Sequence, residues 1–539
     1  MDKMISKIAL LNDIGIALSA EKSSQRVLEL ILDGAKKLTN ADGGSLYTLN
    51  DKDELVFEIV STDSLDIHMG GTTGHSIDFP PLPLHDVKGG DNLSMVVTSA
   101  VLNDNTINIH DAYHADGFDF TGTRKFDENT GYRTKSLLTI PMKNHKADII
   151  GVLQLINSTS HETNEVVDFS TEDQKLAESL ASQAAVALTN KKLIDEQKAL
   201  FEAFIKLIAT AIDEKSPYTG GHCKRLPELT MMIADACDRD TSSALKEFSM
   251  TEKDRYELMI AGWLHDCGKV TTPEYVIDKS TKLETIYDRI NTVNARFEVL
   301  KRDAKIKMLE QQLAAKENAD DALYNSVVTE YEQRIKQLDD DKEFIAVANV
   351  GGEYMAEDKQ NRVQEISKYQ ISDGNGGVND FFNEDEIKNL IIAKGTLTNE
   401  ERQVINNHIV VTIKMLDQLP FPKHLENVPE YAGGHHERMD GKGYPKGLTR
   451  EQMSWPARMM GIADIFEALT ARDRPYKDGK KLSVCLDILG KMRLDNHIDP
   501  EIFDVFIREK VYMQYANEFL TTDQIDDVDH SKIPGYGGE

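Results

Sequence analysis

A long, uninterrupted helical pattern constrains the fold of this chain most. Residues 172–212 contain neither proline nor glycine, and apolar side chains recur at the three- and four-residue spacing of one helix face. The stripe comprises Leu176, Leu180, Ala184, Ala187 and Leu188, and then Phe201, Phe204, Ile205, Ile208 and Ile212. Residues 170–173 can cap its start. The pattern predicts a connecting helix over residues 171–202, between one module before it and one after it.

The connecting helix also bears on the oligomeric state. Its apolar stripe would allow pairing with the same helix of a second copy, so we expect a homodimer. Packing of the stripe against its own chain is the alternative.

The length of the chain agrees with several modules. At 539 residues, 40% of them hydrophobic, it exceeds one ordinary hydrophobic core. We divide it into residues 1–170, the connecting helix, a main domain at 203–515 and a C-terminal tail at 516–539. No run of about 18 uncharged apolar residues occurs, and the N-terminus lacks the basic segment, apolar core and cleavage site of a signal peptide. We therefore expect a cytoplasmic protein with no membrane partner.

The charge of the chain excludes one class of partner. With 62 basic and 91 acidic residues, its net charge is −29, which argues against a protein that grips polymeric nucleic acid over a broad surface. A small phosphate substrate would need a local pocket of metal ions and a few cations. The four cysteines lack paired metal-ligand spacing, so neither a disulfide framework nor a cysteine zinc site is favoured.

The first 170 residues mix helix and strand signals. An amphipathic helix is predicted around residues 27–38, and strands are predicted at 44–49, 54–60, 135–142 and 149–156. This order, with two strands joined by a polar turn at 135–156, resembles a GAF domain. Residues 127–134 also look like the corresponding segment of GAF domains in cyclic-nucleotide phosphodiesterases. The resemblance implies an α+β module that binds a small molecule, dimerises, or transmits motion.

The GAF resemblance is incomplete at the positions that mark nucleotide binding. Cyclic-nucleotide-binding GAF domains carry a spaced Asn-Lys, Phe and Asp-Glu pattern, and this chain offers Asn157, Phe169 and Asp173. Ser158 stands where the lysine belongs and Gln174 where the glutamate belongs. A purely structural GAF-like domain is therefore at least as well supported as one that binds a nucleotide.

A second helical pattern predicts an insertion in the main domain, at about 283–383. Apolar residues alternate steps of four and three at Ile286, Ile290, Val293, Phe297 and Leu300, and a second helical stretch carries Leu323, Val327, Tyr331, Ile335 and Leu338. Residues 318–321 weaken helix propensity between them. We predict an antiparallel helical hairpin, followed by a turn-rich segment at 351–377 and a return to helix near Glu384.

Histidines and an aspartate supply the chemistry of the main domain. Adjacent His435 and His436 precede the glycine-rich run at 437–445. Imidazole nitrogens need polar partners, so two histidines here are better explained as ligands of divalent transition metals than as residues of a hydrophobic core. His265 and Asp266 occur in the run Leu-His-Asp-Cys-Gly-Lys at 264–269. An aspartate can span two cations while a histidine holds one of them, as two-metal hydrolysis of phosphate esters requires.

Five segments together resemble the HD-GYP family of HD phosphohydrolases, which cleave cyclic dinucleotides. They are residues 218–222, 264–269, 401–408, 435–445 and 463–464, and the resemblance extends from about 203 to 507 around the insertion. It implies an all-α main domain. The whole chain is thus expected to be multidomain: an α+β GAF-like domain, a long connecting helix, and an all-α HD-GYP domain with an inserted helical hairpin.

The resemblance implies a set of metal ligands. It places His222, His265, Asp266 and Asp464 around one ion and His408, His435 and His436 around the other, with Asp266 bridging the two. Some family members hold a third ion with a glutamate four residues before the first histidine, where this chain has Tyr218. Two divalent ions are therefore expected, iron or manganese, which ligand softness alone does not distinguish.

The resemblance also implies substrate contacts. Lys269 corresponds to a phosphate-facing lysine, and with Asp266 it forms the expected catalytic pair. In the signature loop, Gly441 and Gly443 permit close backbone approach, Tyr444 offers a flat stacking face and Pro445 restricts the turn. Arg474 and Lys477 match phosphate-contacting cations. Glu437 and Arg438 are assigned a structural role, orienting neighbouring histidines.

The function that follows is hydrolysis of cyclic di-GMP to the linear dinucleotide, and further to GMP, under control of the GAF-like domain and any small molecule it binds. The base preference comes from the family resemblance alone, so a mixed cyclic GMP-AMP stays open as substrate. A different class of function is a cyclic-dinucleotide receptor that has lost turnover. A general HD nucleotide phosphohydrolase ranks lower, because it leaves the Gly-Tyr-Pro loop and residues 474–477 unexplained.

Overall fold

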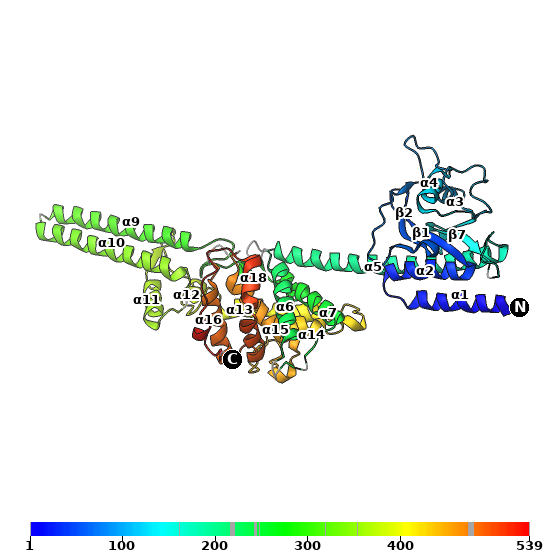
Figure 1. Ribbon diagram of the computed structural model, residues 1–539. Helices are drawn as coiled ribbons and strands as arrows, with labels where there is room; N and C mark the ends of the chain where they lie inside the picture. Colours follow the sequence, from blue (N-terminus) through cyan, green and yellow to red (C-terminus); the bar gives the residue numbers. More distant parts are fainter. Residues whose placement is uncertain are drawn as a thin grey trace. The chain divides into compact units, whose positions relative to one another are not determined.

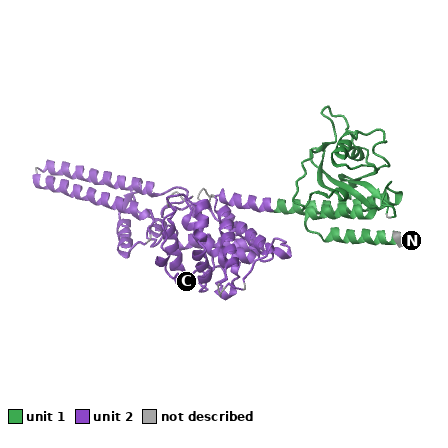
Figure 2. Cartoon of the chain, viewed as in Figure 1, with its two compact units in different colours: residues 1–201 green, residues 202–539 purple. Residues whose placement is uncertain are grey.

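The computed structural model describes residues 2–160, 162–215, 221–241, 245–246, 248–318, 320–352, 354–472 and 479–537. The chain divides into two compact units, residues 1–201 and 202–539, coloured green and purple in Figure 2. None of the helices in these described ranges has the length and apolar character needed to cross a membrane.

The first unit is built on an antiparallel sheet flanked by helices. Its strands are β1 (Ala41–Leu49), β2 (Glu54–Thr62), β3 (Ile67–Gly70), β4 (Leu82–Pro83), β5 (Ile107–Ile109), β6 (Leu137–Lys143), β7 (Ile149–Thr159) and β8 (Val166–Val167). The main order is β3-β2-β1-β7-β6-β5, with β4 beside β2 and β8 beside β7. The helices are α1 (Asp2–Ala20), α2 (Ser24–Thr39), α3 (Val96–Leu102) and α4 (Thr121–Thr130). The predicted helix and all four predicted strands are present.

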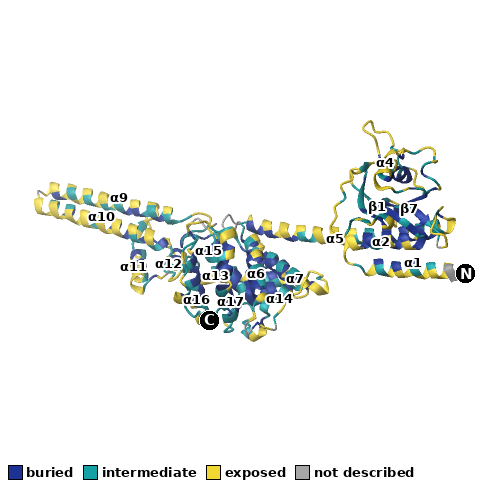
Figure 3. Ribbon diagram, in the orientation of Figure 1, coloured by how far each residue is buried: buried dark blue, intermediate teal, exposed yellow. Residues whose placement is uncertain are grey.

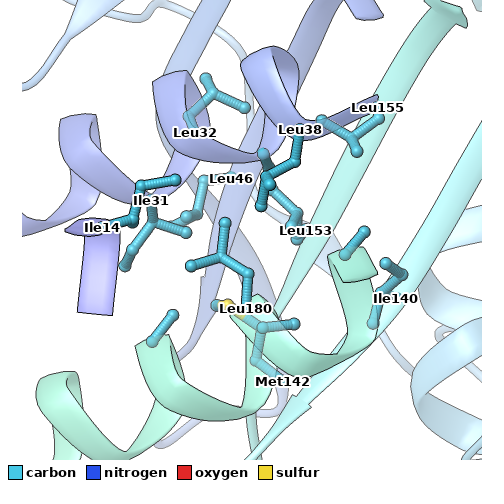
Figure 4. Packing of buried hydrophobic residues seen from close by; sticks show 14 of the residues in the cluster. Ile14, Ile31, Leu32, Leu38, Leu46, Ile140, Met142, Leu153, Leu155 and Leu180 are labelled. Atoms are coloured by element: carbon cyan, nitrogen blue, oxygen red, sulfur yellow. The ribbon is translucent and has the colours of Figure 1, made fainter. Parts of the chain in front are cut away.

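Alternation along the strands divides this unit into two cores. Leu46 and Leu153 face helices α1, α2 and the start of α5 (Thr171–Asp213), and Figure 4 shows them packed beside Ile31 and Leu180. The adjacent residue in each strand points to the other face, where Tyr47 and Val152 pack with α3. This period of two is what a sheet covered on both faces requires.

Helix α5 changes environment along its length. Leu180 and Ala184 are buried in the first unit, whereas Leu193 and Leu200 in the middle are 51% and 58% exposed. Figure 3 shows this middle stretch mostly in the colour of exposed residues. In the last turns of the helix one face is buried again, through Ile205, Ala209 and Ile212.

The second unit is helical. Its main helices are α6 (His222–Arg239), α7 (Glu252–Leu264), α8 (Glu274–Ile277), α13 (Asn399–Leu416), α14 (Val428–Gly433), α15 (Trp455–Thr470), α16 (Leu482–Leu494), α17 (Pro500–Arg508) and α18 (Val511–Phe519). A short 3-10 helix, η2 (Cys267–Thr271), follows α7 and packs against α13, while α6 packs against α7, α15, α17 and α18. This arrangement brings segments far apart in the sequence to one site.

The insertion is an antiparallel helical hairpin with a small base. Helices α9 (Ile290–Glu317) and α10 (Asp321–Asn349) lie side by side in Figure 1. The base contains α11 (Glu357–Ser367), the two-stranded β9 (Gln370–Ser372) and β10 (Val378–Asp380), and α12 (Glu384–Leu390). It has its own core, in which Phe297, Phe381 and Phe382 meet.

Two expectations about the insertion were wrong in detail. The first helix begins at Ile290, and Ile286 lies before it with its side chain 95% exposed. Leu283 is buried in the insertion core without being helical, so the apolar spacing continues beyond the helix. The turn-rich segment at 351–377 contains the helix α11, which packs Val363 and Ile366 into the same core.

The C-terminal residues pack on the second unit. The backbone N–H of Leu482 donates to the carbonyl of Gln524, whose side chain in turn donates to the carbonyls of Thr470 and Lys480. Ile533 is buried. The segment predicted as a tail is thus folded onto α15 and α16 over its described residues.

Candidate metal centre

Three histidines are held in the same way by the turn of chain that precedes them. His265 Nδ1 lies 2.8 Å from the carbonyl oxygen of Gly262, His408 Nδ1 2.6 Å from that of Ile405, and His435 Nδ1 2.6 Å from that of Ala432. Each carbonyl belongs to the residue three positions earlier. A proton on Nδ1 satisfies each carbonyl, which leaves the Nε2 lone pair free to bind a cation.

Asp266 lies between two groups of these Nε2 atoms. Its Oδ2 is 3.1 Å from His265 Nε2 and 3.3 Å from His222 Nε2, whereas its Oδ1 is 3.1 Å from His408 Nε2. His436 Nε2 is 3.3 Å from His408 Nε2. His222, His265 and Asp266 form one group of clustered ligand atoms, and His408, His435 and His436 form another.

Asp464 stands at the edge of the first group. Its Oδ1 lies 3.5 Å from His222 Nε2. It is carried by α15, so α6, the end of α7, α13, the end of α14 and α15 all contribute side chains. The structure brings together every predicted metal ligand.

His222 is oriented by a buried ion-pair network. Its Nδ1 lies 2.5 Å from Glu467 Oε2, and Arg225 pairs with the other oxygen of the same carboxylate. Burial would lower the pKa of His222, but the Glu467 carboxylate outweighs it and raises the pKa to about 10. Likewise, burial would raise the pKa of Glu467, yet His222 and Arg225 lower it to about 2. Neither Arg225 nor Glu467 was among the predicted site residues.

Two buried polar atoms support a metal at this centre. Among the described residues, His435 Nε2 and Asp266 Oδ1 are inaccessible to solvent and have no hydrogen-bond partner. Such atoms are costly unless something satisfies them. Burial, followed by repulsion from His265, lowers the pKa of His435 to about 4, and burial lowers that of His436 well below its ordinary value. Neutral imidazoles of this kind fit a divalent cation.

Lys269 lies beside the carboxylate that the two groups share. Its Nζ is 2.5 Å from Asp266 Oδ2. Burial would lower its pKa, but the Asp266 carboxylate outweighs this and raises it, so the side chain is an ammonium at neutral pH. It projects from η2, which packs tightly on α13: a Cβ at Gly268 would overlap the carbonyl oxygen of His408, and the Gly268 N–H donates to Thr412 Oγ1.

The glycine-rich loop closes over His436. The Tyr444 ring stacks on this imidazole with centroids 4.8 Å apart and planes at 23°. Gly443 sits so close to the chain that a Cβ would overlap the backbone of Glu437 and Arg438, and Gly441 has a φ of +74°. The peptide bond between Tyr444 and Pro445 is cis.

Glu437 and Arg438 hold the loop and its surroundings. The buried Glu437 carboxylate accepts the backbone N–H groups of Lys446 and Leu448. Arg438 pairs with Asp440 and Asp495. Both side chains therefore act on the backbone and on neighbouring carboxylates, and within the described part of the chain neither hydrogen bonds to a histidine.

Three predicted positions lie outside the described residues. They are Tyr218, Arg474 and Lys477. Among the residues that the sequence did not reveal, Glu467 had one available signal, because it follows Asp464 by three positions and so shares its helix face. Arg225 had the same relation to His222. Thr412 gave no signal, since its partner Gly268 is 144 positions away.

The first unit contains a cavity of about 540 Å³. Its aromatic lining comprises Tyr47, Phe57, Phe79, Phe120, Phe126 and Tyr132, and Asp119 is its charged residue; no lysine, arginine or histidine lines it among the described residues. Asn157 and Asp173 do not line it either. Asn157 accepts the Lys135 N–H and donates to the Arg133 carbonyl, and Asp173 pairs with Lys7.

Comparisons with known proteins agree with this architecture. The family model for the GAF domain matches residues 23–188, and the model for an HD domain matches residues 384–502. A 3'3'-cGAMP-specific phosphodiesterase of Vibrio cholerae is 42% identical over 81 residues, which are 15% of this chain and 19% of that protein. A cyclic di-GMP phosphodiesterase of Thermotoga maritima is 31% identical over 159 residues, 28% of this chain and 41% of that protein.

These matches identify the two domains of the chain. It contains a GAF domain and an HD domain, and its HD region is similar to proteins named cyclic di-GMP phosphodiesterases. The chain spans less than half the length of the curated relatives it matches. Among solved structures, the GAF domain of a Coxiella burnetii phosphoenolpyruvate-protein phosphotransferase is 15% identical over 36% of this chain and 98% of that one, with a TM-score of 0.28.

The HD match includes only part of the candidate metal centre. It includes His408, His435, His436 and Asp464, whereas His222, His265 and Asp266 come before it in the sequence. Most of the helical insertion lies between Asp266 and the start of the match, which coincides with the first residue of α12. Folding therefore unites ligands that the insertion separates along the chain.

Proposed function

We propose that this protein is a metal-dependent phosphodiesterase that hydrolyses cyclic di-GMP to its linear dinucleotide, and further to GMP. The observation that carries the proposal is the position of Asp266, whose two oxygens face different groups of histidine nitrogens. A carboxylate in this position suits a pair of divalent ions. When bound, two such ions would supply an activated water and would stabilise charge on the phosphate oxygens.

The residues of the centre have separate roles in this proposal. His222, His265, Asp266 and Asp464 would hold one ion, and His408, His435 and His436 would hold the other. Lys269, an ammonium beside Asp266, contacts the phosphate and stabilises the charge that develops there. The Glu467 carboxylate keeps His222 in orientation, as outer partners of metal ligands do.

The substrate side is assigned to the glycine-rich loop. Tyr444 is in contact with His436, so a base or ribose lying against Tyr444 would be close to the second group of ligands. Gly441, Gly443 and Pro445 set the path of the backbone there. Arg474 and Lys477 are proposed to contact phosphate groups of the dinucleotide.

Iron or manganese is the proposed metal. Imidazole suits iron and carboxylate suits manganese, and this centre offers both kinds of ligand. Cyclic di-GMP is the proposed substrate because several relatives bear that name, while the mixed cyclic GMP-AMP is the alternative because other relatives bear that one.

One experiment tests metal, substrate and extent of reaction together. The protein is purified anaerobically, its metal content is measured, and its products from cyclic di-GMP and mixed cyclic GMP-AMP are identified by chromatography. Asp266→Ala is the matched variant, and it should lose both metal and turnover. If the metal-loaded protein binds these dinucleotides but never cleaves them, it is instead a cyclic-dinucleotide receptor that has lost turnover.

We also propose that the cavity of the GAF domain binds a neutral ring-bearing molecule. A cavity of about 540 Å³ lined by six aromatic rings suits a flat apolar ligand. A cyclic nucleotide carries a negative phosphate, which would lie near Asp119 without a cation among the lining residues described. Calorimetric titration with cyclic AMP and cyclic GMP should therefore give no binding; tight binding of either would contradict the proposal.

A homodimer through α5 completes the proposal. Three leucines of the helix follow one another at intervals of seven residues: Leu193, Leu200 and Leu207. Their exposed fractions are 51%, 58% and 63%, and Phe204, between the last two, is 55% exposed. Exposed apolar residues at this repeat are typical of a two-stranded coiled coil. The second copy of the chain is the proposed occupant of this stripe.

A further inference from the structure

The end of helix α5 contacts the turn that carries Lys269. Lys215 follows the helix by two residues, and its Nζ donates to the carbonyl oxygens of Lys269 (3.1 Å), Val270 (2.5 Å) and Thr272 (2.6 Å). An ammonium group has three donors, and here all three point to one short stretch of backbone. These carbonyls lie at the C-terminal end of η2, where a positive charge is favourable.

The same helix end contacts the segment that carries His222. Asp213 is the last residue of α5 and is buried. Its carboxylate accepts the backbone N–H groups of Gly221 (3.2 Å) and Cys223 (3.4 Å), on either side of His222, the first residue of α6. A carboxylate at this position satisfies N–H groups that a helix start leaves without partners.

The last turns of α5 are themselves fixed in the second unit. Ile205, Ala209 and Ile212 are buried. Lys206 Nζ lies 5.9 Å from the ring centroid of Trp263, which is two residues before His265. The end of α5 thus contacts α7, η2 and the start of α6, the three segments that supply the first group of ligands and Lys269.

We propose that Lys215 and Asp213 are positioning residues through which helix α5 sets the geometry of the metal centre. Neither residue belongs to the proposed metal ligands or substrate contacts. A rotation or shift of α5 would displace the Lys269 turn through Lys215 and the His222 backbone through Asp213. Because α5 begins in the GAF domain, a conformational change in that domain would alter the positions of the metal-centre residues through α5.

The first test substitutes Lys215 in the full-length protein. Lys215→Met should lower kcat for cyclic di-GMP by about 10- to 100-fold, the range for outer partners of metal ligands, with bound metal retained and KM little changed. Lys215→Arg, which keeps the charge and donors, should recover most of the activity. Lys192→Met is the control, since Lys192 is an exposed residue of α5 whose partner is the exposed Glu196.

A second measurement keeps this inference separate from the proposed function on which the kinetic test rests. Amide hydrogen exchange at residues 266–272 should be faster in Lys215→Met than in the parent protein and unchanged in Lys192→Met. If the parent protein hydrolyses no cyclic dinucleotide, the proposed function fails while the exchange result still decides this inference. Unchanged exchange together with unchanged kcat in Lys215→Met would overturn it.

The role of α5 is tested by changing its helical phase. Four residues inserted after Gln197 rotate the following part by about 40°, whereas seven residues rotate it by only about 20° in the opposite sense. The four-residue insertion should change kcat strongly and the seven-residue insertion weakly. In a background of Lys215→Met and Asp213→Asn, the effect of the four-residue insertion should shrink. Fully additive effects would show that these residues do not carry the coupling.

Discussion

The carboxylate of Glu467 lies 2.5 Å from Nδ1 of His222, and this contact raises the pKa of His222 despite its burial. We expect Glu467→Gln, which keeps the shape and removes the charge, to weaken metal binding or activity by about 10- to 100-fold. Titration of the metal-free protein with Mn²⁺ measures the effect. Glu518→Gln, on the exposed surface of α18, is the control, and equal affinities in the two variants would contradict the role given to Glu467.

The close packing of η2 on α13 gives a second prediction. In Gly268→Ala, the new methyl group would overlap the carbonyl oxygen of His408, so η2 or α13 must move. Asp266 and Lys269 would then shift relative to His408, and misplacements of about 1 Å are expected to cost about 100-fold in rate. The measurement is kcat, with circular dichroism to show that the helices persist. Gly352→Ala, where a Cβ meets no atom within 4 Å, should leave the rate unchanged.

Lys282 gives a prediction for the pH dependence of stability. It is 2% exposed, and its Nζ donates to the carbonyls of Leu390 and Ile392. Burial lowers its pKa to about 8, against about 10.4 in an unfolded chain. Between these values the unfolded state binds more protons, so the contribution of Lys282 to stability rises with pH, at a slope approaching about 1.4 kcal/mol per unit.

The Lys282→Met variant isolates this contribution. Its unfolding temperature should gain less than that of the parent protein as the pH is raised from 8 to 10, because the variant has no lysine to deprotonate at this position. The difference between the two proteins, measured by thermal unfolding, removes the effect of other titrating groups. A difference that stays constant over this range would refute the lowered pKa.

The exposed stripe of α5 gives a prediction for assembly. Leu200→Glu places a charge at the centre of the proposed coiled coil, where apolar contact is required, so the protein should sediment as a monomer. Leu494→Glu introduces the same charge at another leucine, 62% exposed, in α16 and should leave the dimer intact. Sedimentation velocity at several concentrations distinguishes the species, and a parent protein that is monomeric at all of them would exclude this interface.

Local sequence patterns predicted most of the elements but not their exact limits. The strands at 44–49 and 149–156 could be predicted because apolar residues alternate or continue over a short run, and both are present in β1 and β7. The predicted start of α9 was too early, because Leu283 continues the helical spacing while lying in a turn whose Lys282 N–H donates to Asn349. That contact spans 67 residues of sequence and leaves no local signal.

In the candidate site too, residues in a local motif could be predicted and residues positioned by long-range contacts could not. His265 and Asp266 are adjacent in the sequence, so a motif reveals them, and the structure brings them together with His222 and His408. The groups that orient the ligands were not predicted. Lys215 lies 54 residues from its acceptor Lys269, and its three acceptors are backbone carbonyls, which every residue has. Only folding selects which carbonyls it meets.

The ion pair between Lys279 and Glu401 bears on how the length of the helical insertion can vary. The two residues are 122 positions apart, and Lys279 Nζ lies 2.8 Å from both carboxylate oxygens of Glu401. The insertion between them therefore leaves and rejoins the domain at one place, so a change of length at the tip of the hairpin does not alter the distance between its two ends. Whole helical turns can be gained or lost at the tip of the hairpin while His265 and His408, on either side of the insertion, keep their places. The domain that carries the metal centre is in this sense insulated from the length of its own insertion.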